Sequence, residues 1–177
     1  MFKMIAATDS FGCAGLNNKL PWHYPEDLKY FQAVTMGCPV IMGHNTFKSI
    51  QSYGMSEGFK GRKNIVITSD PELWTKYLQP ELDVIYVSGI SAAKSAAMVY
   101  SIRNSVCDMW VVGGKSIYEA FMEDDSVTEF HWSVVGNGKE FEGDTYIDFT
   151  PIANRLGLTG TAHLSDDVYV NLYRKEE

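Results

Sequence analysis

The stretch VVGGKSIYEAF (residues 111–121) decides the class of fold that the sequence indicates. A β-branched run typical of a buried strand ends in two glycines and leads directly into a helical segment. In open α/β sheets, ligands bind beyond the carboxyl ends of such strands, where helix N-termini present N–H groups. Gly113 and Gly114 would let a ligand approach the backbone, although a glycine pair can also simply close a tight turn. A third glycine is missing, so this is not the GxGxxG dinucleotide fingerprint.

Similar short apolar runs recur along the chain and alternate with helical segments, which indicates βαβ crossovers and a largely parallel sheet with helices on both faces. After Asp125 the pattern changes to alternating runs at 130–135 and 167–174, with the turn-forming GNG at 136–138, so we expect antiparallel C-terminal strands. We therefore predict a single mixed α/β domain over residues 1–177. The expected strands are 2–8, 39–43, 63–69, 83–88 and 108–114, and the expected helices are 25–35, 45–50, 71–78, 91–104 and 115–123.

The composition sets limits on function. The chain has 177 residues, 45% of them hydrophobic, a formal charge of −7 and a pI near 5.1. This charge argues against a general nucleic-acid or anionic-membrane surface. Three cysteines without a CxxC pair suggest reduced thiols, and the four histidines show no metal-ligand spacing, so surface or satisfied-core roles are expected for them. No targeting segment or membrane span is recognisable, and a cytoplasmic location is expected.

A second informative stretch is LPWHYPEDLKYF (residues 20–31). Pro25 suits the first position of a helix, since its fixed φ is already helical. Residues three and four apart share a helix face, so Asp27 lies on the apolar stripe with Leu28, whereas Glu26 lies off it. Burying a carboxylate without a partner is costly, so Asp27 requires a partner. The alternative, a first-turn acid that caps backbone N–H groups, remains open.

Two further strand ends carry residues suited to phosphate. Gly43 ends a predicted strand shortly before Thr46 at a helix start, and Thr68 and Ser69 end the next strand along the chain. Each could equally be an ordinary helix cap. Arg62 could likewise be half of a solvated charge pair with the residue that follows it. Together, these ends predict a sheet edge that can hold phosphate groups.

Several of these stretches together carry a family pattern. LPWHYPEDLKYF, PVIMGHNTFKSI, GRKNIVITS and VVGGKSIYEAF, in this order and with AATDSFGCAGLNNKLPW before them and EFEGDTYIDF after them, resemble dihydrofolate reductase. The resemblance spans nearly the whole chain and implies a sheet of about eight strands. It implies reduction of 7,8-dihydrofolate to tetrahydrofolate by NADPH, with hydride transfer to C6 and protonation of N5 through water, in support of one-carbon metabolism and thymidylate synthesis. The implied partners are dihydrofolate and NADPH, with no nucleic acid and no membrane, and the implied state is a monomer.

The resemblance also implies roles for particular residues. Asp27 would grip the pterin through paired hydrogen bonds and Ser133 would support that acid, while Leu20 and Trp22 would belong to a mobile lid over residues 15–22. Arg62 would clamp the glutamate carboxylate of the substrate with its planar fork. The substrate-binding residues implied are Ile5, Ala7, Leu28, Phe31, Ile50, Arg62, Val112 and Tyr118.

On the cofactor side, the resemblance places Thr46, Lys115 and Ser116 at phosphates, and Thr68 and Ser69 at the adenosine 2′-phosphate. No metal site is implied. The cofactor-binding residues implied are Ala7, Gly15, Asn18, Leu20, Gly43, His44, Asn45, Thr46, Thr68, Ser69, Val112, Gly113, Gly114, Lys115, Ser116, Ile117 and Tyr118.

The sequence departs from the family pattern in three places. His44 and Ser116 stand where many bacterial relatives have arginine, which should weaken the hold on the cofactor and reduce the preference for NADPH over NADH. The loop after Ile50, up to Gly61, is longer than usual. Two rival hypotheses are the related pyrimidine reductase of riboflavin synthesis and a non-catalytic binding or assembly protein that kept the fold.

Overall fold

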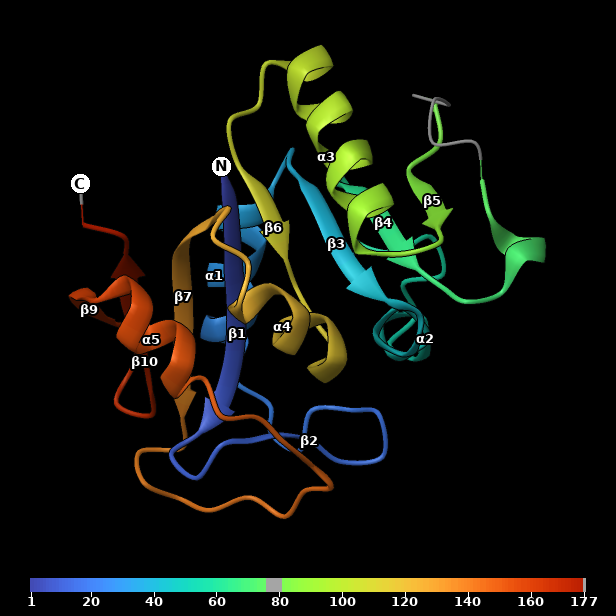
Figure 1. Cartoon of the computed structure of the whole chain (residues 1–177). Helices are drawn as coiled ribbons and strands as arrows, with labels where there is room; N and C mark the ends of the chain where they lie inside the picture. The colour runs from blue at the N-terminus through green and yellow to red at the C-terminus, as the bar shows by residue number, and fades with distance from the viewer. Residues whose placement is uncertain (76–80, 177) are drawn as a thin grey trace. The chain divides into compact units, whose positions relative to one another are not determined.

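The computed structural model describes residues 1–75 and 81–176 of the chain (Figure 1). The chain divides into two compact units. The first unit contains Met1 and Thr35–Ala120, and the second contains Phe2–Val34 and Phe121–Glu177. That residues 1–177 form one domain stays a prediction, and each unit is described by itself.

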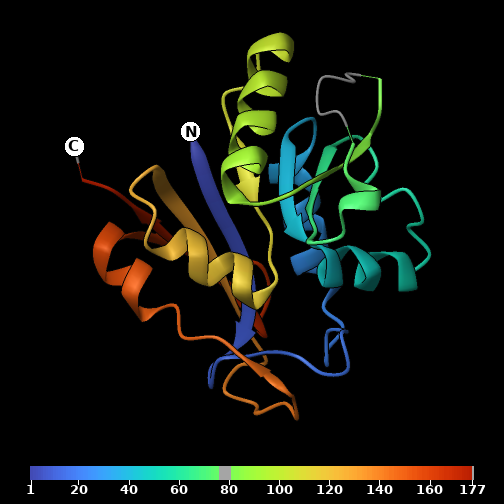
Figure 2. The same cartoon turned by 45° about the vertical axis from the view of Figure 1, so that its right-hand side comes forward.

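The first unit is built on four parallel strands in the order β5-β4-β3-β6. Helix α3 packs against β3, β4 and β6, and α2 begins where β3 ends (Figure 2). The 3-10 helix η1 follows β4. The bounds are β3 (Pro39–Gly43), α2 (His44–Ser52), β4 (Lys63–Ile67), η1 (Pro71–Leu73), β5 (Val84–Val87), α3 (Ile90–Asn104), β6 (Met109–Val111) and α4 (Lys115–Met122).

The second unit is built on four strands in the order β1-β7-β10-β9. Strand β1 pairs parallel with β7, whereas β10 pairs antiparallel with both of its neighbours. A small antiparallel ladder joins β2 and β8. The bounds are β1 (Phe2–Asp9), β2 (Cys13–Gly15), α1 (Pro25–Thr35), β7 (Val127–Val135), β8 (Thr145–Tyr146), α5 (Thr150–Leu156), β9 (Leu158–His163) and β10 (Val168–Arg174).

Helices cover both faces of β7 (Figure 1). Successive residues of a strand point to opposite faces. Phe130 packs its ring against Phe149 at the start of α5, with 4.9 Å between ring centroids. His131, the next residue, bonds instead to Tyr30 of α1. The α1 side and the α5 side of this strand therefore carry different chemistry, apolar toward α5 and polar toward α1.

The predicted fold class is confirmed by these strands, which pair in parallel except around β10 and in the small β2–β8 ladder. The predicted helix at 71–78 is wrong over its first residues. Only η1 forms there, and Asp70 caps it. Trp74 then has an extended ψ of 123°, and the Thr75 N–H donates to the Tyr86 carbonyl at 3.0 Å rather than to a carbonyl of a helix. Residues 76–78 of that prediction lie outside the described residues. The sequence did not reveal β2, β8, α5 or β9. In the described ranges, none of the helices has the length and apolar character that a membrane span requires.

Candidate functional site

The glycine pair at the end of β6 is a close-approach point of the first unit. The Gly43 N–H, at the end of β3, donates to the Gly113 carbonyl at 2.8 Å, so the ends of two strands are joined there. Gly113 has φ +110°, and a Cβ at this position would lie 2.9 Å from the Tyr118 ring. Only glycine satisfies both the left-handed backbone and the tight contact. The glycine pair therefore closes a tight turn, and the same turn brings the backbone of Gly113 against the backbone of Gly43.

Two helix N-termini lie beside this turn. A Cβ on Gly114 would stand 3.0 Å from the Thr46 hydroxyl, so the start of α2 lies directly over the start of α4. The residue before α2 is Gly43, so no N-cap side chain bonds to the first turn of that helix. Helix N-termini present N–H groups and the positive end of the dipole, which suit an anion. A hydroxyl and two helix starts therefore lie together beside the glycine turn, a combination of groups that can bind an anion.

A second polar group lies at the end of β4. The His44 Nδ1 atom is 3.3 Å from the Thr68 hydroxyl, and the His44 ring meets the Tyr86 ring edge-on with 5.9 Å between centroids. Thr68 is buried and Ser69 is exposed. The imidazole, a hydroxyl and an exposed serine thus stand together at one strand end, where a phosphate oxygen could accept hydrogen bonds from them.

The first unit brings most of the expected cofactor residues to the carboxyl ends of β3, β4 and β6. Lys115 is exposed and pairs with Glu119 across one turn of α4 at 3.7 Å, so on this surface it has an ordinary structural partner. The cofactor residues of this unit are Gly43, His44, Asn45, Thr46, Thr68, Ser69, Val112, Gly113, Gly114, Lys115, Ser116, Ile117 and Tyr118; Ala7, Gly15, Asn18 and Leu20 belong to the second unit.

Arg62 is buried and not part of a solvated charge pair, which corrects that alternative. Its side chain donates to the Thr35 hydroxyl at 3.1 Å and to the Lys60 carbonyl at 2.7 Å, and its guanidinium lies over the Phe59 ring. Burial lowers the pKa of Arg62 from its ordinary value. These contacts fix one orientation of the planar fork. Ile50, also expected near the substrate, is buried in the same unit.

The Asp27 carboxyl group is a buried acid in the second unit. Asp27 lies in the first turn of α1, is 8% exposed, and accepts a hydrogen bond from the Ser133 hydroxyl of β7. Burial raises the pKa of Asp27, the Ser133 hydrogen bond opposes that rise, and the charge of Glu26 adds to it. The partner that the sequence required is thus a hydroxyl, which offsets only part of the cost of burying the charge.

Strand register places the neighbouring expected residues. Ala7 of β1 lies opposite Ser133, and Ile5 lies opposite His131, two residues earlier on β7. Ile5 is buried and Ala7 is half-buried. Of the apolar stripe expected on α1, Phe31 is half-buried but Leu28 is 46% exposed. Leu28 is therefore not a core residue, and its apolar surface is available for a ligand.

The predicted lid is hydrogen-bonded to Asp144 within the second unit. The Asn17 N–H donates to the Asp144 carboxylate at 2.9 Å, and the Asp144 N–H donates to the Gly15 carbonyl at 3.0 Å. Asn18 has φ +58° within the tight turn that Leu16 and Lys19 close. The lid therefore bends back on itself and rests against the segment that contains β8.

The two other lid residues differ in burial. Leu20 is 38% exposed, and its closing role stays a prediction. Trp22 is buried in a cluster with Cys13, Val135 and Val168. Packing is the role that the structure shows for the Trp22 ring, and its catalytic role stays a prediction.

The dihydrofolate reductase family model matches residues 1–156. The chain belongs to the dihydrofolate reductase family. The type 9 dihydrofolate reductase of Escherichia coli is 36% identical over 116 residues, which cover 66% of this chain and 60% of that protein. The Bacillus subtilis dihydrofolate reductase is 33% identical over 149 residues, covering 82% of this chain and 74% of that protein. The chain thus spans about three fifths of the first relative's length and about three quarters of the second's.

A solved structure shows the same fold. The dihydrofolate reductase from Enterococcus faecalis, complexed with NADP(H) and RAB-propyl, superposes with a TM-score of 0.73 at 20% identity and covers 99% of this chain and 97% of that chain. At this identity the likeness supports the dihydrofolate reductase fold only.

Sequence reasoning missed several polar residues that hold this dihydrofolate reductase fold around its site. The Asp9 carboxylate accepts hydrogen bonds from the N–H groups of Phe11, Cys13 and Phe141, each at 2.9 Å, and so fixes the base of the lid. Asp144, in the quoted stretch EFEGDTYIDF, is a second such residue, since it bonds to the backbone of Asn17 and Gly15. An aspartate directly after the strand predicted at 2–8, as Asp9 is, was the available signal, because such residues commonly bond to nearby backbone N–H groups.

Glu26 also has a partner that the sequence did not indicate. Its carboxylate accepts a hydrogen bond from the Ser165 hydroxyl at 2.7 Å. This bond, ahead of the charges of His23 and Lys29, lowers the pKa of Glu26. Across residues 1–75 and 81–176, no group of three or more His, Cys, Asp or Glu side chains could hold a metal ion.

Proposed function

We propose that this chain reduces 7,8-dihydrofolate to 5,6,7,8-tetrahydrofolate with NADPH. The observation that carries the proposal is the buried Asp27 carboxylate bonded to Ser133, in a chain of the dihydrofolate reductase family. A buried acid that accepts a hydrogen bond from a hydroxyl is suited to a ligand that offers two parallel N–H donors, as a 2-aminopterin does. Such a ligand supplies hydrogen bonds that replace the water that the carboxylate loses on burial.

On the substrate side, each residue has one task. Asp27 accepts hydrogen bonds from the exocyclic amino group and the adjacent ring N–H, and thereby sets the orientation of the pterin. Phe31 and the exposed Leu28 offer apolar surface to the rings. Arg62, whose fork is already oriented by Thr35 and Lys60, binds the glutamate carboxylate of the substrate.

On the cofactor side, the described residues hold phosphates. The starts of α2 and α4 and the glycine turn would bind the pyrophosphate, with Thr46, Lys115 and Ser116 as side-chain donors. Thr68 and Ser69, with His44, would bind the 2′-phosphate. When bound, the reduced nicotinamide supplies the hydride that C6 receives.

The proton at N5 requires a separate donor. Asp27 holds the opposite edge of the pterin, so it orients and polarises the ring rather than reaching N5 itself. A water supplies the proton, and Leu20, together with the rest of the lid, limits the access of bulk water. In this proposal the protein is a monomer in the cytoplasm and serves one-carbon metabolism and thymidylate synthesis.

The test follows the absorbance of reduced nicotinamide with purified chain and dihydrofolate. Turnover with NADPH is the expected result. Binding of both ligands without turnover would favour the non-catalytic hypothesis, and turnover only with a ribosylamino-pyrimidine would favour the reductase of riboflavin synthesis. Either result would contradict the proposal.

A further inference from the structure

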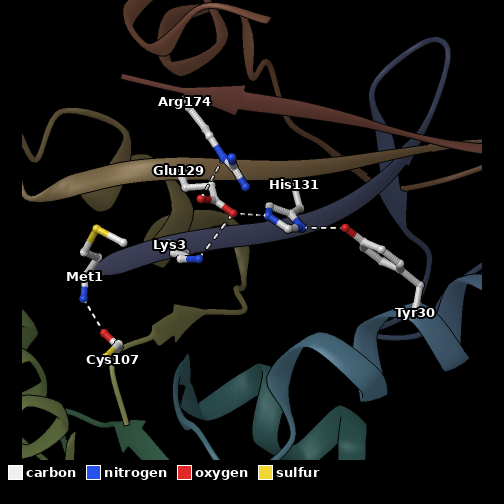
Figure 3. A network of polar contacts seen from close by, with 7 residues as sticks. All are labelled: Met1, Lys3, Tyr30, Cys107, Glu129, His131 and Arg174. Atoms are coloured by element: carbon white, nitrogen blue, oxygen red, sulfur yellow. Dashed lines mark hydrogen bonds and ion pairs between the residues drawn. The ribbon is translucent and has the colours of Figure 1, made fainter. Parts of the chain in front are cut away.

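A polar network links α1, β1, β7 and β10 in the second unit through Tyr30, Lys3, Glu129, His131 and Arg174 (Figure 3). The His131 Nε2 atom is 2.5 Å from a carboxylate oxygen of Glu129, and the His131 Nδ1 atom is 2.6 Å from the Tyr30 hydroxyl. Because a carboxylate only accepts, His131 must donate from Nε2 to Glu129, and Nδ1 pairs with the phenol. Helix α1 is thus tied to β7 through the side chain of Tyr30.

Two cations hold the far end of this network in place. The Lys3 ammonium lies 3.3 Å from Oε1 of Glu129, and the Arg174 guanidinium lies 3.0 Å from Oε2. The cations come from β1 and β10, the two strands that flank Glu129 on β7. Glu129 is therefore fixed from both sides and cannot rotate without losing an ion pair. It in turn fixes the ring of His131.

The charges in the network support this arrangement. Burial acts to raise the pKa of Glu129, but the His131 hydrogen bond and the charges of Lys3 and Arg174 lower it to about 2. Burial and the nearby charges of Glu129 and Asp27 raise the pKa of Tyr30 to about 12. Glu129 therefore stays ionised and the phenol stays protonated over the working pH range, so both hydrogen bonds persist.

Helix geometry connects the network to the substrate acid. Tyr30 follows Asp27 by three residues, so both side chains point from the same face of α1 toward β7. Their partners, His131 and Ser133, are two residues apart and point to one face of that strand. The two bonds, Tyr30 to His131 and Asp27 to Ser133, are therefore two rungs between the same pair of elements.

We propose that Tyr30, His131 and Glu129 are positioning residues that fix the rotation of α1 and thereby the direction of the Asp27 carboxylate. Without the Tyr30–His131 bond, α1 can rotate or shift about the Asp27–Ser133 bond, and that bond weakens. Preorganised groups lose effectiveness through small displacements, so the binding of the pterin should suffer most. The consequence for catalysis rests on the proposed function, but the positioning itself does not.

The first test measures the titration of the Asp27 carboxyl group by carbon-detected NMR in the ligand-free chain. Burial and the charge of Glu26 raise the pKa of Asp27, and the Ser133 hydrogen bond lowers it. Tyr30→Phe should move the Asp27 midpoint upward, because we expect it to weaken the Ser133 bond, which lowers that pKa. Tyr173→Phe, which removes a phenol on β10 outside the network, serves as the matched control and should leave the midpoint unchanged.

The second test uses kinetics. Tyr30→Phe should raise the KM for dihydrofolate about fivefold, the equivalent of one ordinary hydrogen bond, and leave the KM for NADPH unchanged. His131→Gln, whose amide can both donate and accept, should restore most of the affinity that His131→Leu loses. General destabilisation would not produce this split between the two KM values.

An unmoved Asp27 midpoint in folded Tyr30→Phe would overturn the inference, as would equal losses in His131→Gln and His131→Leu. If Tyr30→Phe does not fold, the His131→Gln and His131→Leu pair decides by the same titration. A wild-type chain that binds but does not turn over dihydrofolate would contradict the proposed function alone, since the Asp27 titration would still decide the positioning.

Discussion

The Asp27 carboxylate in the first turn of α1 accepts a hydrogen bond from the Ser133 hydroxyl of β7. This bond joins a helix to a strand rather than capping the helix, so the capping alternative does not account for it. The acid remains costly to bury, since one neutral donor offsets only part of the desolvation of a carboxylate. A buried carboxylate that is present at a cost in folding stability is expected to bind a ligand.

Replacing Asp27 by asparagine should therefore not destabilise the ligand-free chain. Burial raises the folded-state pKa of Asp27 above its unfolded value, so stability is lost as the pH rises through that interval. Asparagine cannot ionise and still accepts from Ser133. At pH 7, Asp27→Asn should melt at the same or a higher temperature than wild type, and any advantage should shrink below the unfolded pKa. Calorimetry checks this, with exposed Asp166→Asn as control. A clearly lower melting temperature at pH 7 would contradict it.

The contribution of Glu129 to stability should depend on pH in the opposite direction from that of Asp27. Its folded-state pKa of about 2 lies below the ordinary value of 4.5, so its stabilisation is present above pH 4.5 and is lost as the pH falls toward 2. Glu129→Gln should cost about 2–3 kcal/mol of unfolding free energy at pH 7. The gap to wild type should close between about pH 4.5 and 2 in denaturant titrations. A gap that does not depend on pH would show that the charge of Glu129 is not what stabilises the fold.

His44→Arg should sharpen the choice of cofactor. An arginine is always charged and can form paired hydrogen bonds with a phosphate, so NADPH should bind about tenfold tighter. NADH has no 2′-phosphate, and its affinity should stay nearly unchanged. Dissociation constants for both cofactors, with Lys48→Arg on the same helix as control, measure the difference. An equal gain for both cofactors would mean that His44 does not face the 2′-phosphate.

Gly114→Ala tests the space beside the Thr46 hydroxyl. The added Cβ would lie 3.0 Å from that oxygen and occupy the place proposed for a phosphate. NADPH affinity should fall about tenfold, since the backbone could no longer be approached closely. Gly160→Ala, where a Cβ would meet nothing within 4 Å, should leave the affinity unchanged. Equal affinities for both variants and wild type would remove the glycine turn from the cofactor site.

Elements with strong local signals were predictable from the sequence. Helix α1 spans Pro25–Thr35, as predicted, because a proline suited to the first position coincides with an apolar period near 3.6. The strand at 39–43 was equally predictable from its buried β-branched run. The helix at 71–78 was not, because longer-range bonds such as the one from the Thr75 N–H to the Tyr86 carbonyl override local propensity.

Other features have signals too weak to recognise in one sequence. Strand β9 is largely exposed, so it lacks the alternation that marks a half-buried strand. His131 was expected in a surface or satisfied-core role, and the structure shows the second. Its partners Glu129 and Tyr30 come from different elements, and a pairing between elements is fixed by strand register and helix placement, which a single sequence does not contain.

The most direct test of the central claim compares wild type with Asp27→Asn, following the oxidation of NADPH in the presence of dihydrofolate. Wild type should turn over, and folded Asp27→Asn should bind NADPH normally but lose about 100-fold or more of its rate, because the pterin is no longer held and polarised by a charge. Near-normal turnover by the folded variant would contradict the assignment of Asp27 as the anchor of the substrate.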